Sequence, residues 1–217
     1  MNNIIKIAEE QLTSCISKID QFNVKEFFKH RKSSKCCGKN FEDAEDDVEL
    51  GEEIMENALS EASLALAKEN PELHNRGAGG LITLKTNRLS AMQVEGFSDA
   101  VQAIKSELSS GLGGHWIVSG LHYYPQYAYM GWHTNANYPG KRFYLTYAEE
   151  GDKSFMRREE NGEIITDMDK YGWQAREFDI PEENYYWHCV GSRTKRYSLG
   201  FRQLTSSHIL LAGGIEE

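Results

Sequence analysis

Residues 196–202 read Arg-Tyr-Ser-Leu-Gly-Phe-Arg, so that polar or small residues alternate with large apolar ones. Successive side chains of a β-strand point to opposite faces, and the stretch therefore predicts a strand with one apolar face. The other face carries Arg196, Ser198, Gly200 and Arg202. A guanidinium buried inside a β-core needs an anionic partner, and its fork of donors suits a carboxylate. Arg196, with the Ser198 hydroxyl two residues further on, is therefore a candidate carboxylate anchor.

The rest of the second half, from His115 onward, has the same strand-like character. Tyr and Trp are concentrated there, and aromatic residues favour pleated, half-buried surfaces. Asn161-Gly162 is a strong hairpin signal. Closely spaced strands joined by such turns are typical of a sandwich, a barrel or a jelly roll. The predicted strands are 116–118, 121–124, 142–148, 154–158, 163–166, 175–179, 185–188 and 197–204.

The first half of the chain is predicted to be helical. Its apolar residues recur at three- and four-residue intervals, which is the pattern of amphipathic helices. The predicted helices are 4–19, 50–68 and 98–108. We therefore expect an α+β protein with a mainly β core, in which a helical N-terminal portion (1–114) packs on a β-core (115–217) within one structural domain.

The charge of the chain limits its partners. With 217 residues and a formal net charge of −9, the protein lacks the cationic face that broad phosphate-backbone binding needs. A basic stretch at 25–39 would suit a nucleic-acid arm, but the acidic run at 42–53 directly after it offsets its field. Nucleic acid is therefore not an expected partner.

Location and redox state follow from what the sequence lacks. No apolar run approaches the length of a membrane span, and the first residues lack the apolar core of a secretory signal. A cytoplasmic protein without a membrane partner is expected. The four cysteines lack a CxxC spacing and are predicted to be reduced and incidental. They are Cys15, Cys36, Cys37 and Cys189.

A second motif, His133-Thr134-Asn135, is a candidate for half of a metal site. In an extended segment, residues two apart point to the same side, so the imidazole and the carboxamide can face one point in space. Imidazole is a good ligand for iron, whereas an amide oxygen is a weaker donor than a carboxylate. His188 lies much later in the chain, and a jelly roll can bring such distant strand ends together across one mouth.

His-x-Asn, a distal His and Arg-x-Ser, in this order, resemble the motif of the iron(II)/2-oxoglutarate-dependent oxygenases. That motif is His-x-Asp/Glu, a distal His, and then Arg-x-Ser or a related basic motif. The resemblance covers residues 121–203. It implies a double-stranded β-helix, which is a form of jelly roll, and a non-haem dioxygenase with Fe(II) as cofactor and 2-oxoglutarate as cosubstrate. Hydroxylation is the commonest outcome in such enzymes.

For the metal, the resemblance implies that His133 and His188 bind iron, with Asn135 in the place of the acidic ligand. Three explanations of Asn135 compete. Its amide oxygen binds the metal, a halide or water fills the position and permits halogenation, or the site is degenerate. Asn is bulkier than the Gly or Ala of halogenating relatives, which disfavours the second explanation. Glu149 or Glu150 could instead supply a carboxylate from elsewhere.

For the cosubstrate, the resemblance implies that Arg196 binds the distal carboxylate of 2-oxoglutarate and that Ser198 assists. Arg202 is the rival anchor, because relatives differ in which basic residue they use. Tyr124 or Tyr144, on earlier strands, could offer a phenol to the same carboxylate.

Two other functions remain open. A catalytically degenerate β-helix could serve as a binding or structural protein, and Asn135 favours this reading. A cupin-type metalloprotein could use His122, His133 and His188 without 2-oxoglutarate, although it would leave Arg196 without a role. For the oxygenase, we expect the N-terminal helices and the loop at 158–173 to shape the substrate pocket.

Overall fold

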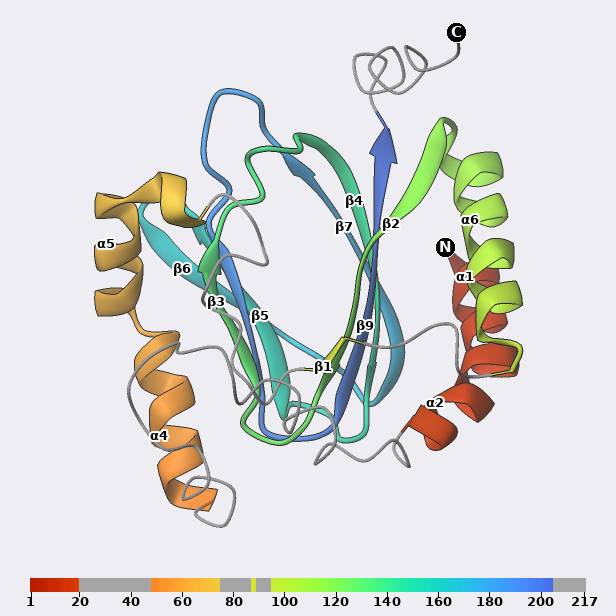
Figure 1. Cartoon of the computed structure of the whole chain (residues 1–217), viewed down its shortest axis with the longest axis horizontal. Coiled ribbons are helices and arrows are strands. Elements are labelled where there is room, and N and C mark those ends of the chain that lie inside the picture. Colours follow the sequence, from red (N-terminus) through yellow and green to blue (C-terminus); the bar gives the residue numbers. More distant parts are fainter. Residues whose placement is uncertain (20–47, 75–86, 89–94, 205–217) are drawn as a thin grey trace, which may run out of the picture.

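The computed structural model describes residues 1–19, 48–74, 87–88 and 95–204. In this part of the chain, the strands form two antiparallel sheets that face each other (Figure 1). The first sheet contains, in order of pairing, β1 (Asn87–Arg88), β2 (His115–Tyr124), β9 (Arg196–Leu204), β4 (Gly140–Ala148) and β7 (Gly172–Ile180). The second sheet contains β3 (Tyr129–His133), β8 (His188–Ser192), β5 (Ser154–Glu160) and β6 (Glu163–Met168).

The order of the strands is that of a jelly roll. From β2 to β5 the chain changes sheet at every step, and after the β5–β6 hairpin it changes sheet again at β7, β8 and β9. Each long connection therefore crosses an end of the sandwich, and strand ends from distant parts of the sequence meet there. The predicted mainly β fold with two antiparallel layers is confirmed.

Several strands have limits that differ from those predicted from the sequence. The strands expected at 116–118 and 121–124 are one strand, β2, with a register shift between Val118 and Gly120. The hairpin at Asn161-Gly162 is confirmed, since both residues have positive φ (55° and 86°) and join β5 to β6. The strand expected at 185–188 is β8, which begins only at His188. Its Gly and Ser residues have low strand propensity, so the aromatic run before it dominated the prediction.

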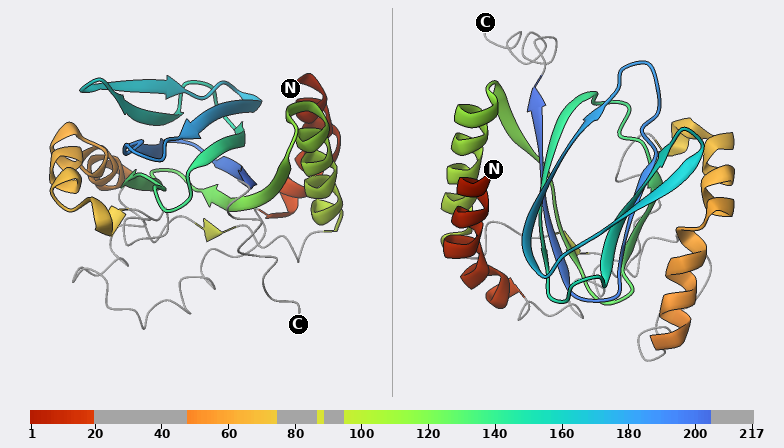
Figure 2. Two further views of the ribbon diagram at one scale, coloured as in Figure 1. Left: turned by 90° about the horizontal axis from the view of Figure 1, so that it is seen from above. Right: turned by 180° about the vertical axis from the view of Figure 1, so that it is seen from behind.

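Helices cover the outer faces of both sheets (Figures 1 and 2). The first sheet is covered by α1 (Asn2–Ile7), the π-helix η1 (Ala8–Leu12), α2 (Thr13–Ile19) and α6 (Phe97–Leu112). The second is covered by α4 (Val48–Ala58) and α5 (Glu61–Glu69), followed by the 3-10 helix η3 (Pro71–His74). The predicted helix at 50–68 is therefore two helices. Ser60 starts the second one by accepting a hydrogen bond from the Ser63 N–H at 3.2 Å.

The alternation predicted for β9 decides which side chains point inward. Tyr197, Leu199 and Phe201 pack in the apolar cluster beneath α1 and α6. Ser198, Gly200 and Arg202 line a cavity on the other side. The helices thus bury the apolar outer faces, while the facing inner sides of the sheets carry both polar residues and a smaller apolar cluster that includes Met130, Met156 and Val190.

Some sequence features lie outside this description. The basic stretch at 25–39 and the Cys36-Cys37 pair belong to residues that the structure does not describe. Cys15 and Cys189 are buried free thiols. Among the described helices, none is both long and apolar enough to cross a membrane.

Candidate functional site

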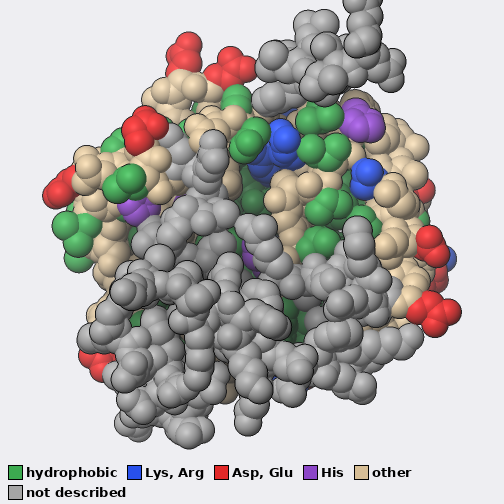
Figure 3. Space-filling view, in the orientation of Figure 1, with side chains coloured by type: hydrophobic (Ala, Val, Ile, Leu, Met, Phe, Trp, Pro, Cys, Tyr) green, Lys and Arg blue, Asp and Glu red, His purple; other side chains and the backbone are tan. Residues whose placement is uncertain are grey.

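A cavity of about 350 Å³ lies between the two sheets, with walls from β2, β3, β4, β8 and β9. Figure 3 shows basic and hydrophobic side chains gathered where the sheets face each other. The cavity combines aromatic, imidazole and guanidinium groups with a few apolar side chains. Its described polar and aromatic lining consists of Ser119, His122, Tyr124, His133, Asn135, Tyr138, Arg142, Tyr144, His188, Ser198 and Arg202.

His133 and His188 are direct neighbours in the cavity wall. His133 ends β3, His188 begins β8, and the two residues are paired in the register of these strands. Their ring centroids lie 4.0 Å apart. The strand pairing therefore brings together the two histidines that the sequence separates by more than fifty residues, as the jelly-roll prediction required.

The backbone fixes the tautomer of both rings. His133 Nδ1 lies 2.8 Å from the Gly131 carbonyl oxygen, and His188 Nδ1 lies 2.9 Å from that of Tyr186. A carbonyl oxygen only accepts, so each Nδ1 carries the proton and donates. Each Nε2 is then left with its lone pair. Histidines that bind metals are oriented in this way, through a hydrogen bond from the nitrogen that does not bind.

Both imidazoles are neutral at neutral pH. Burial lowers the pKa of His133 to about 4, against a smaller opposing effect of its bond to Gly131. Burial, and next the neighbouring His133, lower the pKa of His188 well below its usual value. Only a neutral imidazole binds a metal, so the two rings are in the state that coordination needs.

Asn135 also lies beside the two histidines, but a turn places it there and not the alternation of a strand. β3 ends at His133, and Asn135 has a left-handed backbone (φ 56°), which Asn tolerates better than most residues. Its amide Nδ2 lies 3.2 Å from His188 Nε2. The sequence therefore anticipated the neighbourhood of His133, Asn135 and His188, but a turn produces it instead of strand alternation. A half-turn of the amide exchanges Nδ2 for Oδ1, the atom able to bind a metal.

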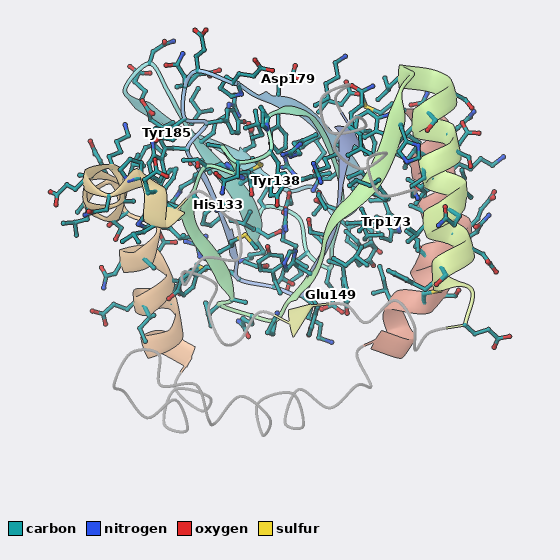
Figure 4. All side chains as sticks on the ribbon, turned by 45° about the horizontal axis from the view of Figure 1, so that its top comes forward. His133, Tyr138, Glu149, Trp173, Asp179 and Tyr185 are labelled. Atoms are coloured by element: carbon teal, nitrogen blue, oxygen red, sulfur yellow. The ribbon has the colours of Figure 1, made fainter. Side chains whose placement is uncertain are left out.

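The two acidic residues considered as replacements do not lie at the cavity. Glu149 and Glu150 follow the far end of β4, where Glu150 accepts a hydrogen bond from Thr194 at 3.2 Å. Figure 4 shows Glu149 at the end of the sandwich away from Asp179. Within the described residues, no group of three His, Cys, Asp or Glu side chains could hold a metal. His122 lines the cavity but does not complete such a group.

Arg196 does have the anionic partner that its burial demands, but the partner is internal. Its Nε donates to Asp169 Oδ2 at 2.7 Å, and the two side chains are 2% and 0% exposed. Arg176 and Ser154 also donate to this carboxylate, at 2.6 and 2.5 Å. Arg196 is not among the residues that line the cavity.

Asp169 is ionised within this network. Burial alone would raise its pKa, but Arg196, Arg176 and the Ser154 hydroxyl outweigh burial and hold the pKa below its usual value. Nothing in the sequence distinguished Asp169 from the other acidic residues near the hairpin. Of the two arginines considered as anchors, Arg202 lines the cavity and Arg196 does not.

Arg202 and Arg142 are the two arginines of the cavity wall. They face each other directly across β9 and β4. Within the described part of the chain, Arg202 Nη1 is buried without a hydrogen-bond partner, and its guanidinium lies 4.5 Å from the centre of the Tyr138 ring. Arg142, only 3% exposed, donates to the Tyr138 carbonyl oxygen. Sequence reasoning missed Arg142, although it begins one of the predicted strands.

The phenols of Tyr124 and Tyr144 lie in the same cavity, together with Ser198. Burial raises the pKa of both tyrosines, so each phenol remains protonated and can donate a hydrogen bond. Tyr144 packs against Gly200, where an added Cβ would lie 3.0 Å from its ring. The glycine thus makes room for the ring.

The elements expected to shape the substrate pocket do not line it. The described N-terminal helices lie on the outer faces of the sheets, and the described wall contains no residue of 158–173. The reason is the jelly-roll topology, because strands rather than their helical covers enclose the space between the sheets.

No sequence family and no curated protein matches the chain. A 2OG-Fe(II) oxygenase family oxidoreductase from Burkholderia pseudomallei is similar in structure, with a TM-score of 0.38 and 12% identity over 51% of this chain. The chain spans 58% of the length of that protein.

Two further solved structures are similar at the same level. A prolyl-4-hydroxylase from Pseudomonas putida has a TM-score of 0.40 and 15% identity, over 73% of this chain and 88% of its own. An RmlC-like cupin from Shewanella frigidimarina has a TM-score of 0.27 and 12% identity, over 43% and 70%. Similarities this weak carry no argument about the site.

Proposed function

We propose that the protein is a non-haem iron oxygenase with a double-stranded β-helix scaffold and 2-oxoglutarate as cosubstrate, and that it hydroxylates its substrate. One observation carries the proposal: two buried, neutral imidazoles share a cavity with an arginine donor that has no partner among the described residues. Ligands for a divalent metal and a counter-charge for an anion therefore occur in one place. Bound iron and 2-oxoglutarate would together supply the oxidising chemistry.

His133 and His188 would hold the iron through Nε2, while the Gly131 and Tyr186 carbonyls orient the rings. Asn135 is the available third donor, through Oδ1 after a half-turn of its amide. This set lacks the negative charge of a carboxylate, so we expect it to bind iron more weakly than a set with an acid. The amide already fills the space beside His188 that a halide would need, which disfavours halogenation.

Arg202 would hold the distal carboxylate of 2-oxoglutarate, because its buried Nη1 is a hydrogen-bond donor that has no partner among the described residues. Ser198, Tyr124 and Tyr144 line the same cavity and can add hydrogen bonds. Arg196 keeps its structural bond to Asp169. Apolar side chains complete the wall and help to exclude water from the reacting groups.

Metal binding tests the proposal first. Calorimetry with Mn(II), a redox-silent substitute, should show one site in the wild type and none in His133→Ala or His188→Ala. His115→Ala is the matched control, because this histidine is exposed and lies outside the cavity. Release of succinate from 2-oxoglutarate by the iron-loaded protein, on admission of oxygen, then tests turnover. Absence of both metal and 2-oxoglutarate binding would end the catalytic proposal.

Asn135→Asp tests the third position. A carboxylate within reach of the metal should raise the metal affinity by about tenfold or more, because it adds a negative charge to a set of neutral donors. Unchanged affinity would remove residue 135 from the metal site.

A binding protein without catalysis is the second candidate. The favouring observation is that the Asn135 amide lies against His188 Nε2, the nitrogen that a metal would need. If that contact is permanent, metal should fail to bind while anions still bind at the arginines. The same Mn(II) titration, repeated with 2-oxoglutarate alone, separates the two candidates.

A further inference from the structure

Arg142 and Arg202 differ from the other arginines of the molecule. Every other arginine whose side chain is described makes an ion pair with a carboxylate; these are Arg157, Arg158, Arg176, Arg193 and Arg196. Within the described residues, Arg142 and Arg202 make none, and the described lining of their cavity contains no Asp or Glu. Two positive charges therefore face a cavity that supplies no negative charge of its own.

The pairing of the two strands makes this arrangement costly. Arg142 and Arg202 are cross-strand partners, and like charges in this position repel each other. The proximity of Arg202 lowers the pKa of Arg142 in addition to the larger effect of burial. A guanidinium nevertheless stays protonated, so the repulsion persists in the ligand-free protein.

The contacts of Arg142 satisfy some of its donors but do not neutralise it. Its Nη2 donates to the Tyr138 carbonyl oxygen, while Nη1 lies 3.5 and 3.4 Å from the carbonyl oxygens of Gly140 and Lys141. Carbonyl groups are dipoles without net charge, and contacts at these longer distances are weak. A buried cation in this state calls for an anion.

Of the two carboxylates of 2-oxoglutarate, one would bind the metal, so a single negative charge is left to offset the two positive charges of Arg142 and Arg202. 2-Oxoglutarate has one distal carboxylate, and Arg202, with its partnerless Nη1, is the better placed to receive it. Arg142 is then left without a counter-charge. The next molecule to enter the cavity is the substrate, so the substrate is the remaining source of negative charge.

We propose that Arg142 is a specificity-determining anion anchor, and that the substrate is a small molecule with a carboxylate or phosphate group that Arg142 binds while 2-oxoglutarate occupies Arg202. This inference rests on the proposed function. The cavity of about 350 Å³ suits small ligands. Tyr138, 43% exposed, stacks on Arg202 and supplies a carbonyl to Arg142, so it lies at the edge where such a molecule enters. Figure 4 shows Tyr138 and His133 between the two sheets.

Inorganic phosphate and acetate are suitable probes, because each carries one of the two acidic groups and nothing else. Each is titrated by calorimetry into the full chain, loaded with Mn(II) and saturated with 2-oxoglutarate. At least one probe should bind to the wild type beside 2-oxoglutarate, and the stronger of the two identifies the acidic group. Competition between the probe and 2-oxoglutarate, or binding of neither probe, would overturn the inference without any variant.

Variants locate the site. Arg142→Gln should lower the affinity for the probe by about tenfold or more, which corresponds to the loss of one charge-assisted hydrogen bond. The affinity of the Arg142→Gln variant for 2-oxoglutarate should stay within about threefold of that of the wild type. Lys141→Gln removes the same charge from the adjacent, exposed residue and should change neither value. Arg142→Lys keeps the charge and should retain most of the probe binding, whereas equal binding by Arg142→Gln and the wild type would contradict the assignment.

The test separates this inference from the function on which it rests. If the probe binds through Arg142 in a protein that fails to bind Mn(II) and 2-oxoglutarate, the oxygenase proposal falls and the anion anchor stands. If Mn(II) and 2-oxoglutarate bind but neither probe does, the oxygenase proposal stands and the anchor falls.

Discussion

Arg196 and Arg202 lie six residues apart on the same inner face of β9, yet their surroundings are opposite. Arg196 is enclosed with Asp169, Arg176 and Ser154 in a hydrogen-bonded network. Arg202 faces a cavity without a described acid and has a buried donor without a partner. Arg196 Nη1 is likewise buried without a partner among the described residues, so the two ends of the strand differ in their counter-charge. We call the Arg196 end, which has Asp169, the satisfied end, and the Arg202 end, which has no acid among the described residues, the waiting end.

The difference shows how to separate structural from functional arginines in a β-core. Both kinds give the same sequence signal, because alternation only predicts that the side chain points inward. Burial of an ion pair is tolerated when both partners are present, and loss of one partner leaves an uncompensated charge. The location of the carboxylate, not of the arginine, therefore decides the role.

The largest expected effect on stability comes from removing the counter-charge of Arg196. Asp169→Asn should lower the free energy of unfolding by about 3–5 kcal/mol, because it leaves the buried Arg196 without its counter-charge. Urea denaturation measures this change. Asp167→Asn is the control, since Asp167 is 42% exposed and its bridge to Arg158 should contribute at most about 1 kcal/mol. If the two substitutions cost the same, the Asp169 network is not the structural element described above.

Lowering the pH should reduce the free energy of unfolding through the histidine pair and through Asp169, each in a different pH range. His133 is neutral in the folded protein with a pKa of about 4, whereas an unfolded histidine has its usual pKa near 6.5. The unfolded state therefore binds more protons between these values, and stability should fall as the pH drops from about 6.5 to about 4. Because the folded state lowers the pKa of Asp169, protonation of this carboxylate should reduce the free energy of unfolding further only below about pH 3.8, its usual pKa.

Urea denaturation of metal-free protein at a series of pH values checks this prediction. His133→Asn should flatten the upper range, while His115→Gln should leave it unchanged because His115 is exposed. Equal stability at pH 7 and pH 5 in the wild type would contradict the burial of neutral imidazoles.

The smallest expected effect on stability is at the waiting end. Arg202→Met should change the free energy of unfolding by no more than about 1 kcal/mol, or raise it, because it removes an unpaired charge from a partly buried position and its repulsion with Arg142. A loss as large as that of Asp169→Asn would show that Arg202 has a structural partner after all. Thermal or urea denaturation without ligands makes the comparison.

The inner-face pattern of β9 followed from alternation, which is a local property of the sequence, and the approach of His133 to His188 followed from the jelly roll that the strand pattern and the motif resemblance predicted. Asp169 and Arg142 did not, because their roles depend on which residues face each other across sheets. The left-handed turn at Asn135 also escaped prediction, since it breaks the alternation that placed its side chain. Sequence thus indicated which histidines and which asparagine meet in the cavity, but not the charge balance around them.

The most direct test of the account is a titration of 2-oxoglutarate into the wild type and into Arg202→Gln, each with and without Mn(II). We predict binding that requires the metal in the wild type and that weakens by about 30-fold or more in Arg202→Gln, the effect of removing one partner of a buried charge pair. Lys141→Gln, which loses the same charge outside the cavity, should bind as the wild type does. Equal binding by the wild type and Arg202→Gln, or binding that ignores the metal, would contradict the account.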